Sequence, residues 1–422
     1  MADDRQKADA QRCGASDPRR CGPAALARLL TQTRARLLAL VDDLDDSQWQ
    51  VPLREGLNPF SWELAHVAWF AEWWTLRGPH RPDASGRLLA TRAPRHAGPD
   101  EILDSSRLAH TERWRLALPS PARVRRMLAS QLDDSLEALA RLPDRDEALY
   151  FHRLALMHEA MHCEALVWMR AALAYPAPAG AVLPARAADA ADARPVRVAG
   201  GVLRLGASDD APGFFFDNER GRAELALADF DIDPAPVSAG RFLAFVQDGG
   251  YADPRWWPGE AGRWLAARGL AHPERWRRTG AGWECRWFDR WLPLDPGQPA
   301  IHLSAWEAEA WCRWANRSLP SAAQWQHAAA QGPLAWGESV WEWTADAFLP
   351  YPGFAPGAYR DYSAPWFGDH RELRGAAFAT EPPIRDPRYR NFFTPGRTDV
   401  FAGFRTVSPP AAGTTAPQTD RA

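Results

Sequence analysis

Two histidines four residues apart are the first candidates for chemistry in this sequence. His158 and His162 lie in the stretch Leu156–Glu164 (LMHEAMHCE), in which strong helix formers predominate. Residues four apart lie on the same face of a helix, so the two imidazoles can aim at one point. Histidine is the commonest side chain that binds metals in proteins. The pair predicts a metal site, although the same spacing also arises by chance on helix faces that bind no metal.

A third histidine extends this prediction. His66 lies in a second apolar, helix-like stretch, Ser61–Phe70. Three imidazoles would leave open coordination positions on a metal such as Fe(II), where O2 and a soft substrate atom can bind. Glu159 and Glu164 flank the histidine pair, and they either orient the imidazoles as outer carboxylates or lie on a solvated flank. The central prediction is that His66 meets the pair at one ion.

Residues 158–162 also fit the HExxH pattern of zinc proteases, in which the glutamate is the general base. The extended form of that pattern needs Gly and His where this chain has Ala165 and Trp168. The shorter form needs a glutamate downstream, yet no glutamate occurs between Glu164 and Glu219. We therefore expect no zinc protease.

The elements that must position these histidines are helices. Apolar residues recur with the helical period in four segments, at about 24–44, 60–76, 120–141 and 146–173. Asn58 and Pro59 predict an N-cap and a first turn for the second segment. A long polar connection, residues 78–104, follows it. Four helices with one long crossover predict a bundle, whose interior is a usual place for metal ligands.

The composition changes after a linker rich in Pro, Ala and Asp at residues 175–195. Short β-like runs follow at 196–198 and 202–205, and helices are expected near 239–248 and 304–317, within chain that is rich in Gly, Pro and Trp. The predicted fold class is α plus α+β. The predicted organisation is a disordered tail (1–22), a metal-binding helix bundle (23–174), the linker (175–195), an α+β domain (196–407) and a second disordered tail (408–422).

Composition excludes several classes of function. A net charge of −3 over 422 residues offers no basic footprint for nucleic acid. No apolar stretch is long enough to span a membrane, and the charged start is unlike a secretory signal. The 5 Cys form no CxxC pair or secreted disulfide pattern, so we expect a soluble, cytoplasmic protein. The 22 Trp indicate either a loop-rich core or a pocket for a sugar or a cation.

Residues 58–69 and 158–164 resemble the DinB-like domain of the ergothioneine synthase EgtB family. The second half resembles the formylglycine-generating-enzyme fold, of the C-type-lectin-like kind, that follows in the same family. The matching segments are 236–242, 306–310, 319–325, 340–344 and 389–393 through 403–405. This resemblance covers residues 25–406. It implies that His66, His158 and His162 bind Fe(II) and that O2 is a co-substrate.

The resemblance also implies substrate-binding residues. Residues 359–362 (YRDY) match the family's YxxY element, in which Tyr359 would donate a proton near the iron and Tyr362 would face the imidazole of hercynine, a trimethylated histidine. Asn391 would hold the carboxylate of hercynine. Aromatic residues would face its trimethylammonium group by cation–π contact: Phe392, Phe393 or Trp366.

Several positions depart from the family's pattern. Formylglycine-generating enzymes carry a reactive cysteine pair near the C-terminal end, but this chain has no cysteine after Cys312, so we expect no such activity. Family members that use γ-glutamylcysteine or cysteine carry Gln and Asp where this chain has Met161 and Phe393. These changes suggest a different donor at that end of the site.

Residues 104–114 (DSSRLAHTERW) resemble the selenoneine synthase branch of the family, which joins hercynine to the selenium of a selenosugar. In that segment Arg107 and Arg113 would contact the donor, next to Met161. The preferred interpretation is therefore selenoneine biosynthesis. The alternatives are a sulfoxide synthase that uses a thiol donor in ergothioneine biosynthesis, and a non-catalytic metal-binding or scaffold protein.

Overall fold

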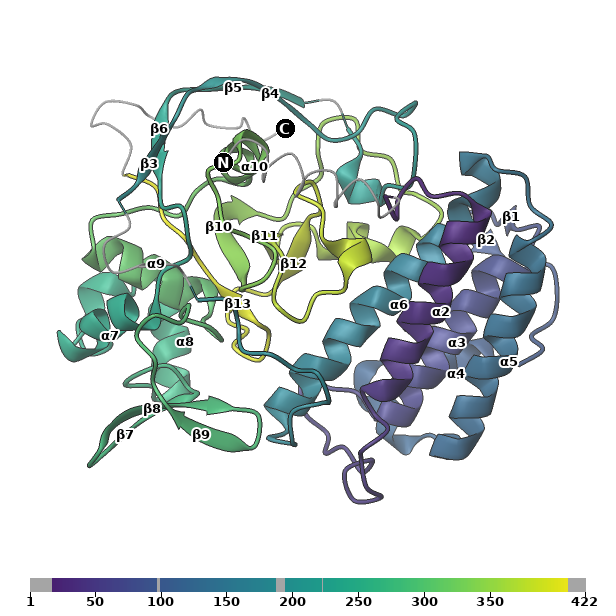
Figure 1. The fold of residues 1–422 in the computed structure, drawn as a ribbon, viewed down its shortest axis with the longest axis horizontal. Helices are drawn as coiled ribbons and strands as arrows, with labels where there is room; N and C mark the ends of the chain where they lie inside the picture. The colour runs from purple at the N-terminus through teal and green to yellow at the C-terminus, as the bar shows by residue number, and fades with distance from the viewer. Residues whose placement is uncertain (1–16, 97–98, 187–193, 222, 409–422) are drawn as a thin grey trace, which may run out of the picture.

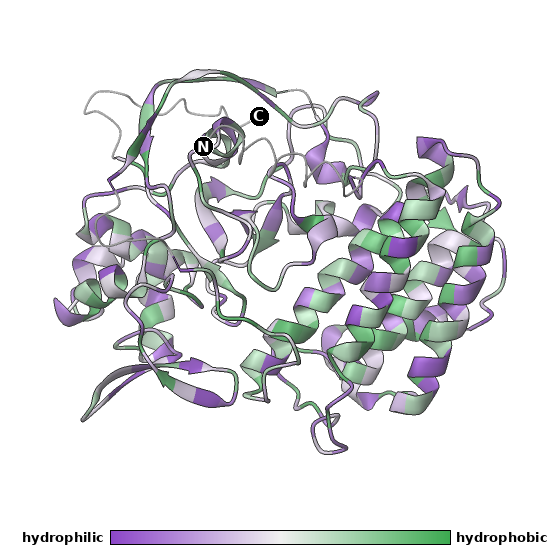
Figure 2. Cartoon of the chain, viewed as in Figure 1, coloured by the Kyte–Doolittle hydropathy of each residue, from purple (hydrophilic) through white to green (hydrophobic). Residues whose placement is uncertain are grey.

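The structure is a computed structural model, and it describes residues 17–96, 99–186, 194–221 and 223–408. Long helices stand side by side in one half of the molecule, and small sheets and shorter helices make up the other half (Figure 1). Hydrophobic and hydrophilic residues are interspersed along the long helices (Figure 2). None of the described helices combines the length and the apolar character that a membrane span requires.

The four predicted long helices are confirmed. They are α2 (Pro23–Ala39), α3 (Phe60–Leu76), α5 (Pro121–Leu139) and α6 (Asp146–Ala172). Helix α3 is buried at almost every position from Phe60 to Trp74, because it packs against both α5 and α6. A helix that is hydrophobic all round belongs in the centre of a bundle. His66 therefore lies in the interior, not on an outer face.

The predicted start of α3 is wrong in its capping residue. Pro59 is the N-cap, and no side chain caps the helix. The amide of Asn58 instead donates a hydrogen bond to Oε2 of Glu63, at 2.8 Å. A hydrogen bond to an ionised carboxylate is stronger than one between neutral groups, so the side chain turns toward Glu63.

The crossover between α3 and α5 contains more structure than the sequence predicts. It holds a short hairpin, β1 (Arg81–Pro82) and β2 (Leu88–Leu89), a short helix α4 (Asp100–Leu103) and a 3-10 helix η1 (His110–Arg115). The indole of Trp62 donates to the carbonyl of Ile102 at 2.8 Å. This contact holds α4 against α3 and places Leu103 beside His66.

The central sheet of the C-terminal half has the strand order β12-β11-β10-β13. Its strands are β10 (Trp341–Ala347), β11 (Arg371–Gly375), β12 (Asn391–Phe393) and β13 (Ala402–Gly403). Only the β10–β13 pair is parallel. Two helices pack near this sheet, α9 (Ala305–Trp314) and α10 (Ala322–Gln331), and each begins with a capping box.

The remaining elements are short. The smaller sheets pair β3 (Val196–Val198) with β6 (Phe230–Ile232), β4 (Gly201–Leu205) with β5 (Ala223–Leu227), and β7 (Trp276–Thr279) with β8 (Gly282–Trp287) and β9 (Arg290–Pro293). The helices expected near 239–248 and 304–317 are confirmed as α7 (Ala239–Gln247) and α9. The sequence missed α8 (Glu260–Arg268) and α10, which are only 9 and 10 residues long.

The predicted first tail is wrong for residues 17–22. Arg19 is buried, and its guanidinium binds both carboxylate oxygens of Glu219 at 2.8 and 2.9 Å. It also lies 3.3 Å from Asp386. Such buried ion pairs hold the start of the bundle against the C-terminal domain. The rest of the first tail, the second tail after Ser408 and residues 187–193 of the predicted linker lie outside the described residues.

Candidate metal centre

Three imidazoles from two helices meet in the bundle interior. One ligand atom from each of His66, His158 and His162 lies within 4.8 Å of the others. The ring centroids of His66 lie 5.0 Å and 5.2 Å from those of His158 and His162, and the Nε2 atoms of the α6 pair lie 3.1 Å apart. The 3.1 Å spacing of the pair on α6 fits one ion with metal–nitrogen bonds of about 2 Å, and the ring of His66 lies beside that pair. The predicted convergence is confirmed.

Burial favours the neutral form of two of these imidazoles, those of His66 and His158. Burial, followed by the charge of His162, lowers the pKa of His66 to about 3. Burial and the neighbouring His162 and His66 lower the pKa of His158 well below its ordinary value. Because a metal binds the neutral imidazole, no proton has to be displaced from these two rings before a metal binds. The donor set therefore fits a divalent metal ion.

The imidazoles of His66 and His162 are each oriented by an oxygen atom. Nδ1 of His66 lies 2.7 Å from the carbonyl oxygen of Leu103, and Nδ1 of His162 lies 2.6 Å from Oε1 of Glu63. Since these oxygens accept hydrogen bonds, each Nδ1 carries the proton and Nε2 is left to face the centre. This is the usual arrangement of metal-binding histidines.

Glu63 is the residue that sequence reasoning missed. It is buried, and it accepts hydrogen bonds from His162 and Asn58. Burial favours its neutral form, but the charge and hydrogen bond of His162 outweigh that effect and lower the pKa of Glu63 to about 2. A lone carboxylate in the apolar run 60–71, one helical turn before His66, was the available signal.

The expectation that Glu159 orients an imidazole is wrong. Both of its carboxylate oxygens bind the guanidinium of Arg34 on α2, at 2.6 and 2.9 Å. Residue 159 lies about 100° around the helix from His158, so it faces α2 instead of the centre. It is also buried, which contradicts the alternative of a solvated flank.

Glu164 does not contact the imidazoles either. Its carboxylate accepts hydrogen bonds from the indole of Trp341 at 2.7 Å and from the hydroxyl of Thr380 at 2.8 Å. Burial raises the pKa of Glu164 to about 7, against the lowering effect of these two donors. The residue connects α6 to the C-terminal domain and lines the cavity described next.

A cavity of about 320 Å³ opens beside the three histidines, between the bundle and the C-terminal domain. The structure brings most of the predicted site residues to its wall. They are His66, Arg113, His158, Met161, His162, Glu164, Tyr359, Tyr362, Asn391, Phe392 and Phe393. A cleft between domains with aromatic walls and a few polar groups is typical of small-molecule sites.

Two predicted residues do not line this cavity. The side chain of Arg107 is 41% exposed and lies 3.5 Å from Asp104, with which it forms a surface ion pair. Trp366 is also 41% exposed, and its ring packs against His370. The predictions for Arg107 and Trp366 are therefore wrong, because neither side chain lines the cavity and each contacts another partner.

Arg113 does reach the cavity. Its guanidinium lies 3.9 Å from the ring centroid of Trp62, and Nη1 donates to Oδ1 of Asn58 at 2.6 Å. Burial lowers the pKa of Arg113, against the raising effect of Glu63. The stacked arginine puts a positive charge at the bundle end of the cavity.

Tyr359 lies at the partition between this cavity and the outer part of the bundle. Its ring makes edge contacts with Phe70, at 4.9 Å between centroids, and with His158, at 6.2 Å. Burial raises the pKa of Tyr359, and the charges of Asp361 and Asp104 raise it further, although a hydrogen bond with Ser105 opposes this. The phenol therefore retains its proton.

Tyr362 faces a second tyrosine across the cavity wall. The hydroxyl groups of Tyr362 and Tyr389 are hydrogen-bonded to each other at 2.8 Å, and they lie 3.6 and 3.2 Å from Sδ of Met161. Phe216 stacks on Tyr362, with 4.2 Å between ring centroids. Met161 thus lies between the metal ligands and the aromatic wall.

Asp217 stabilises the loop that carries Tyr359 and Tyr362. This carboxylate accepts hydrogen bonds from the hydroxyl of Ser363 and, at 3.2 Å, from the amide of Gly357. Asp217 belongs to the 3-10 helix η2 (Asp217–Glu219), whose Glu219 binds Arg19. A chain of contacts therefore runs from the N-terminal segment to Tyr359 and Tyr362.

Comparison with known proteins agrees with this two-domain architecture. Residues 29–166 match the DinB superfamily, and residues 181–339 match the sulfatase-modifying factor enzyme 1-like domain. The predicted fold class, a DinB-like bundle followed by a formylglycine-generating-enzyme-like domain, is confirmed.

Relatives that match along nearly the whole chain are hercynine oxygenases. The protein of that name from Mycobacterium tuberculosis is 32% identical over 431 residues, which cover 91% of this chain and 98% of the relative. The hercynine oxygenase of Mycolicibacterium thermoresistibile is 30% identical, over 90% of this chain and 94% of its own length. The formylglycine-generating enzyme of Streptomyces coelicolor is 32% identical over 40% of this chain and 59% of its length. The chain belongs to the hercynine oxygenase family of oxidoreductases.

Proposed function

We propose that this chain is an Fe(II)-dependent enzyme that uses O2 to join hercynine to a sulfur- or selenium-containing donor. The observation that carries the proposal is the meeting of His66, His158 and His162 at one side of an aromatic cavity between two domains. The name of the full-length relatives supports hercynine as the acceptor. The proposed bond forms at the imidazole carbon between the two nitrogens.

The three imidazoles would hold the iron ion, and the bound ion would supply the activation of O2. Neutral ligands leave the full positive charge on the site, which favours an anionic, soft sulfur or selenium atom from the donor. Glu63 keeps His162 in the tautomer that presents Nε2 to the centre. The chain's own part in metal binding is thus to fix three nitrogens and to favour the neutral form of His66 and His158.

The aromatic wall would bind hercynine. Phe392 and Phe393 line the cavity, and an aromatic ring there would attract a trimethylammonium group by a contact worth about 1–2 kcal/mol when desolvated. The side-chain oxygen of Asn391 accepts from the amide of Phe392 at 2.9 Å, so its NH2 group is the end that would donate to the carboxylate. Tyr362 would then face the imidazole ring of the substrate.

Tyr359 would supply a proton at its phenol oxygen. It lines the cavity beside His66 and His158, and burial keeps it protonated. Ser105 fixes the direction of the hydroxyl by a hydrogen bond. A positioned acid of this kind typically contributes 10²–10⁴-fold to a rate.

Two classes of donor are candidates. A thiol donor, as in the ergothioneine sulfoxide synthases, agrees better with the relatives, which are hercynine oxygenases. A selenosugar is the second candidate, and the charge of the cavity favours it. Arg113 is the one arginine among the residues that line the cavity, and Glu63 and Glu164 are acidic. A donor with two carboxylates would find one guanidinium for two negative charges, whereas sugar hydroxyls need no cationic partner.

The experiment is a direct comparison of donors. Anaerobically purified, iron-loaded protein is mixed with hercynine, O2 and either γ-glutamylcysteine or a selenosugar, and products are identified by mass spectrometry. We expect O2-dependent consumption of hercynine with at least one donor. Turnover with the thiol alone would overturn the selenium proposal. Iron bound by the three histidines without any turnover would instead indicate the non-catalytic alternative.

A further inference from the structure

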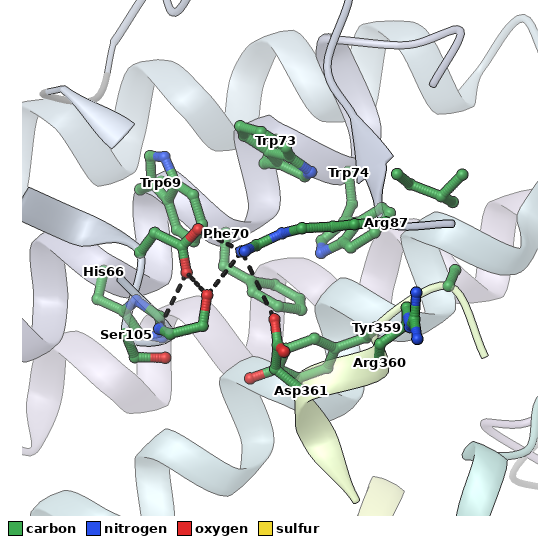
Figure 3. Close-up of a pocket in the computed structure, with 14 residues that line it drawn as sticks. His66, Trp69, Phe70, Trp73, Trp74, Arg87, Ser105, Tyr359, Arg360 and Asp361 are labelled. Carbon is green, nitrogen blue, oxygen red and sulfur yellow. Dashed lines mark hydrogen bonds and ion pairs between the residues drawn. The ribbon is translucent and has the colours of Figure 1, made fainter. Parts of the chain in front are cut away.

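A second, much smaller cavity lies beside His66, and Figure 3 shows the residues that line it. Its volume is about 40 Å³. Its wall combines apolar residues, which are Trp69, Phe70, Trp73, Trp74, Leu88 and Ala358, with the charged residues Arg87, Asp104, Arg360 and Asp361. The mechanism proposed above does not use this space.

The small cavity ends directly behind the metal ligands. His66, Ser105 and Tyr359 line both cavities, so they form the partition between the two spaces. Phe70, on the wall of the small cavity, stacks on the ring of His158 at 3.6 Å and an angle of 5°. A molecule in the small cavity is therefore one side chain away from the ligands on α3 and α6.

Its size and chemistry exclude the organic substrates. A space of this volume holds one or two water-sized molecules, far less than hercynine or any donor needs. The indole and phenyl part of the wall, where Trp69 and Phe70 contact the ring of His66, suits a small apolar molecule, as dry apolar cavities that take up xenon do.

The outer side of the small cavity is closed by Arg87 (Figure 3). Its Nη2 atom donates to Asp104 at 2.7 Å and to the hydroxyl of Ser106 at 2.6 Å, and it lies 3.5 Å from Asp361. The ion pair with Asp361 is partly exposed, with 32% and 40% of the two side chains accessible. Exposed ion pairs are weak, so the contact between Arg87 and Asp361 can open transiently while Arg87 stays on Asp104.

We infer that the small cavity is an inlet through which dioxygen reaches the metal centre while the large cavity is filled. This inference rests on the proposed function, which requires two organic substrates and O2 at one ion. The substrates would occupy the 320 Å³ cavity and block that approach. The small cavity leaves a separate path of the right size and polarity on the opposite side of Tyr359.

The first test uses a variant in which the small cavity is narrower at Leu88. Leu88→Trp adds bulk at a residue that lines it, and Leu89→Trp, at the next residue of β2, is the matched control because Leu89 does not line it. Nitric oxide, a diatomic probe, is mixed without O2 with iron-loaded protein that is saturated with hercynine. We expect Leu88→Trp to slow nitric oxide binding severalfold and, in turnover, to raise KM for O2 without changing KM for hercynine.

The second test needs no variant, no metal and no turnover. Crystals of the metal-free wild-type protein are pressurised with xenon, and we expect xenon among Trp69, Phe70 and Trp73. Xenon in the large cavity alone, or equal nitric oxide rates in Leu88→Trp and Leu89→Trp, would overturn the inlet. Because neither measurement needs a product, a failed inlet and a failed proposed function give different results.

Discussion

The two halves of the molecule build the site in different ways. In the helix bundle, the metal ligands come from regular helices: His158 and His162 are one turn apart on α6, and His66 faces them from α3. In the C-terminal domain, the cavity wall comes from the 3-10 helix η4 (Arg360–Tyr362) and the short strand β12. The first arrangement follows from a local repeat, and the second depends on contacts between distant segments.

In the C-terminal domain, buried ion pairs hold irregular chain in place, as backbone hydrogen bonds hold the helices of the bundle. The guanidinium of Arg390, next to β12, lies 2.6 Å from the carboxylate of Glu372. The guanidinium of Arg405 binds both carboxylate oxygens of Glu342, with 2.6 Å between Nη2 and Oε1. All four side chains are at most 2% exposed. Since removing one partner of such a pair costs about 3–5 kcal/mol, these contacts fix irregular chain firmly. Because the two halves are held by different interactions, we expect that a substitution can abolish metal binding or substrate binding without abolishing the other.

The largest effect is expected from His158→Ala. It removes one of three ligands and leaves the C-terminal wall intact, so both bound iron and O2-dependent turnover should be lost. Iron content and product formation are measured together. His152→Ala is the control, because His152 is a buried histidine on the same helix whose ring contacts the carbonyl of Ser135. Equal loss of iron in both variants would contradict a specific ligand role.

The next effect separates the two halves. Tyr359→Phe should keep the iron content of the wild type and lower kcat by about 10²–10⁴-fold, because only the proton donor is removed. Tyr351→Phe is the control, since Tyr351 is a tyrosine of the same domain that binds Arg374 and does not line the cavity. A parallel loss of iron in Tyr359→Phe would show that the wall and the ligands are not separable.

A smaller effect is expected from Glu63→Gln. The amide of the new glutamine can still contact His162, but the substitution removes the negative charge that favours the metal-binding tautomer of His162. Outer-sphere substitutions of this kind typically weaken metal affinity about 10–100-fold. Iron titration measures this change, with Glu72→Gln as the control. Glu72 is a buried glutamate on the same helix that accepts from the amide of His96, so its loss should leave iron affinity unchanged.

The smallest effect concerns the pH dependence of stability through Asp386, which contacts Arg19 of the N-terminal segment. Burial alone would raise the pKa of Asp386, but Arg388 and Arg19 lower it from 3.8 to about 2. The carboxylate therefore stabilises the folded state above about pH 4, and this contribution of about 2 kcal/mol is lost as the pH falls toward 2. Urea unfolding at pH 5, 4 and 3 should show it. Asp386→Asn should have a shallower pH dependence, and an unchanged slope would contradict the assignment.

Much of the bundle could be predicted from the sequence because its signals are local. The helical period located α2, α3, α5 and α6, and the four-residue spacing placed His158 and His162 on one face. Glu159 shows the limit of this reasoning. Its direction on the helix is fixed by the same period, but its partner, Arg34, lies 125 residues away. Only the packing of α2 against α6 reveals that contact.

The C-terminal half was less predictable because its structure depends on distant contacts. Tyr359 and Tyr362 have no periodic signal, and only the resemblance to a family pointed to them. Arg19 was assigned to a disordered tail because its partner Glu219 is 200 residues away. The positions of Arg107 and Trp366 outside the cavity wall were equally invisible, since a motif does not say which way a loop side chain turns.

The most direct test of the central claim is the position of the metal itself. Crystals of protein loaded anaerobically with Fe(II) are measured at the iron absorption edge, so that anomalous scattering locates the ion. The account predicts one iron per chain, within about 2 Å of a ring nitrogen of each of His66, His158 and His162. Iron bound by only two of these residues, or at any other place in the chain, would contradict it.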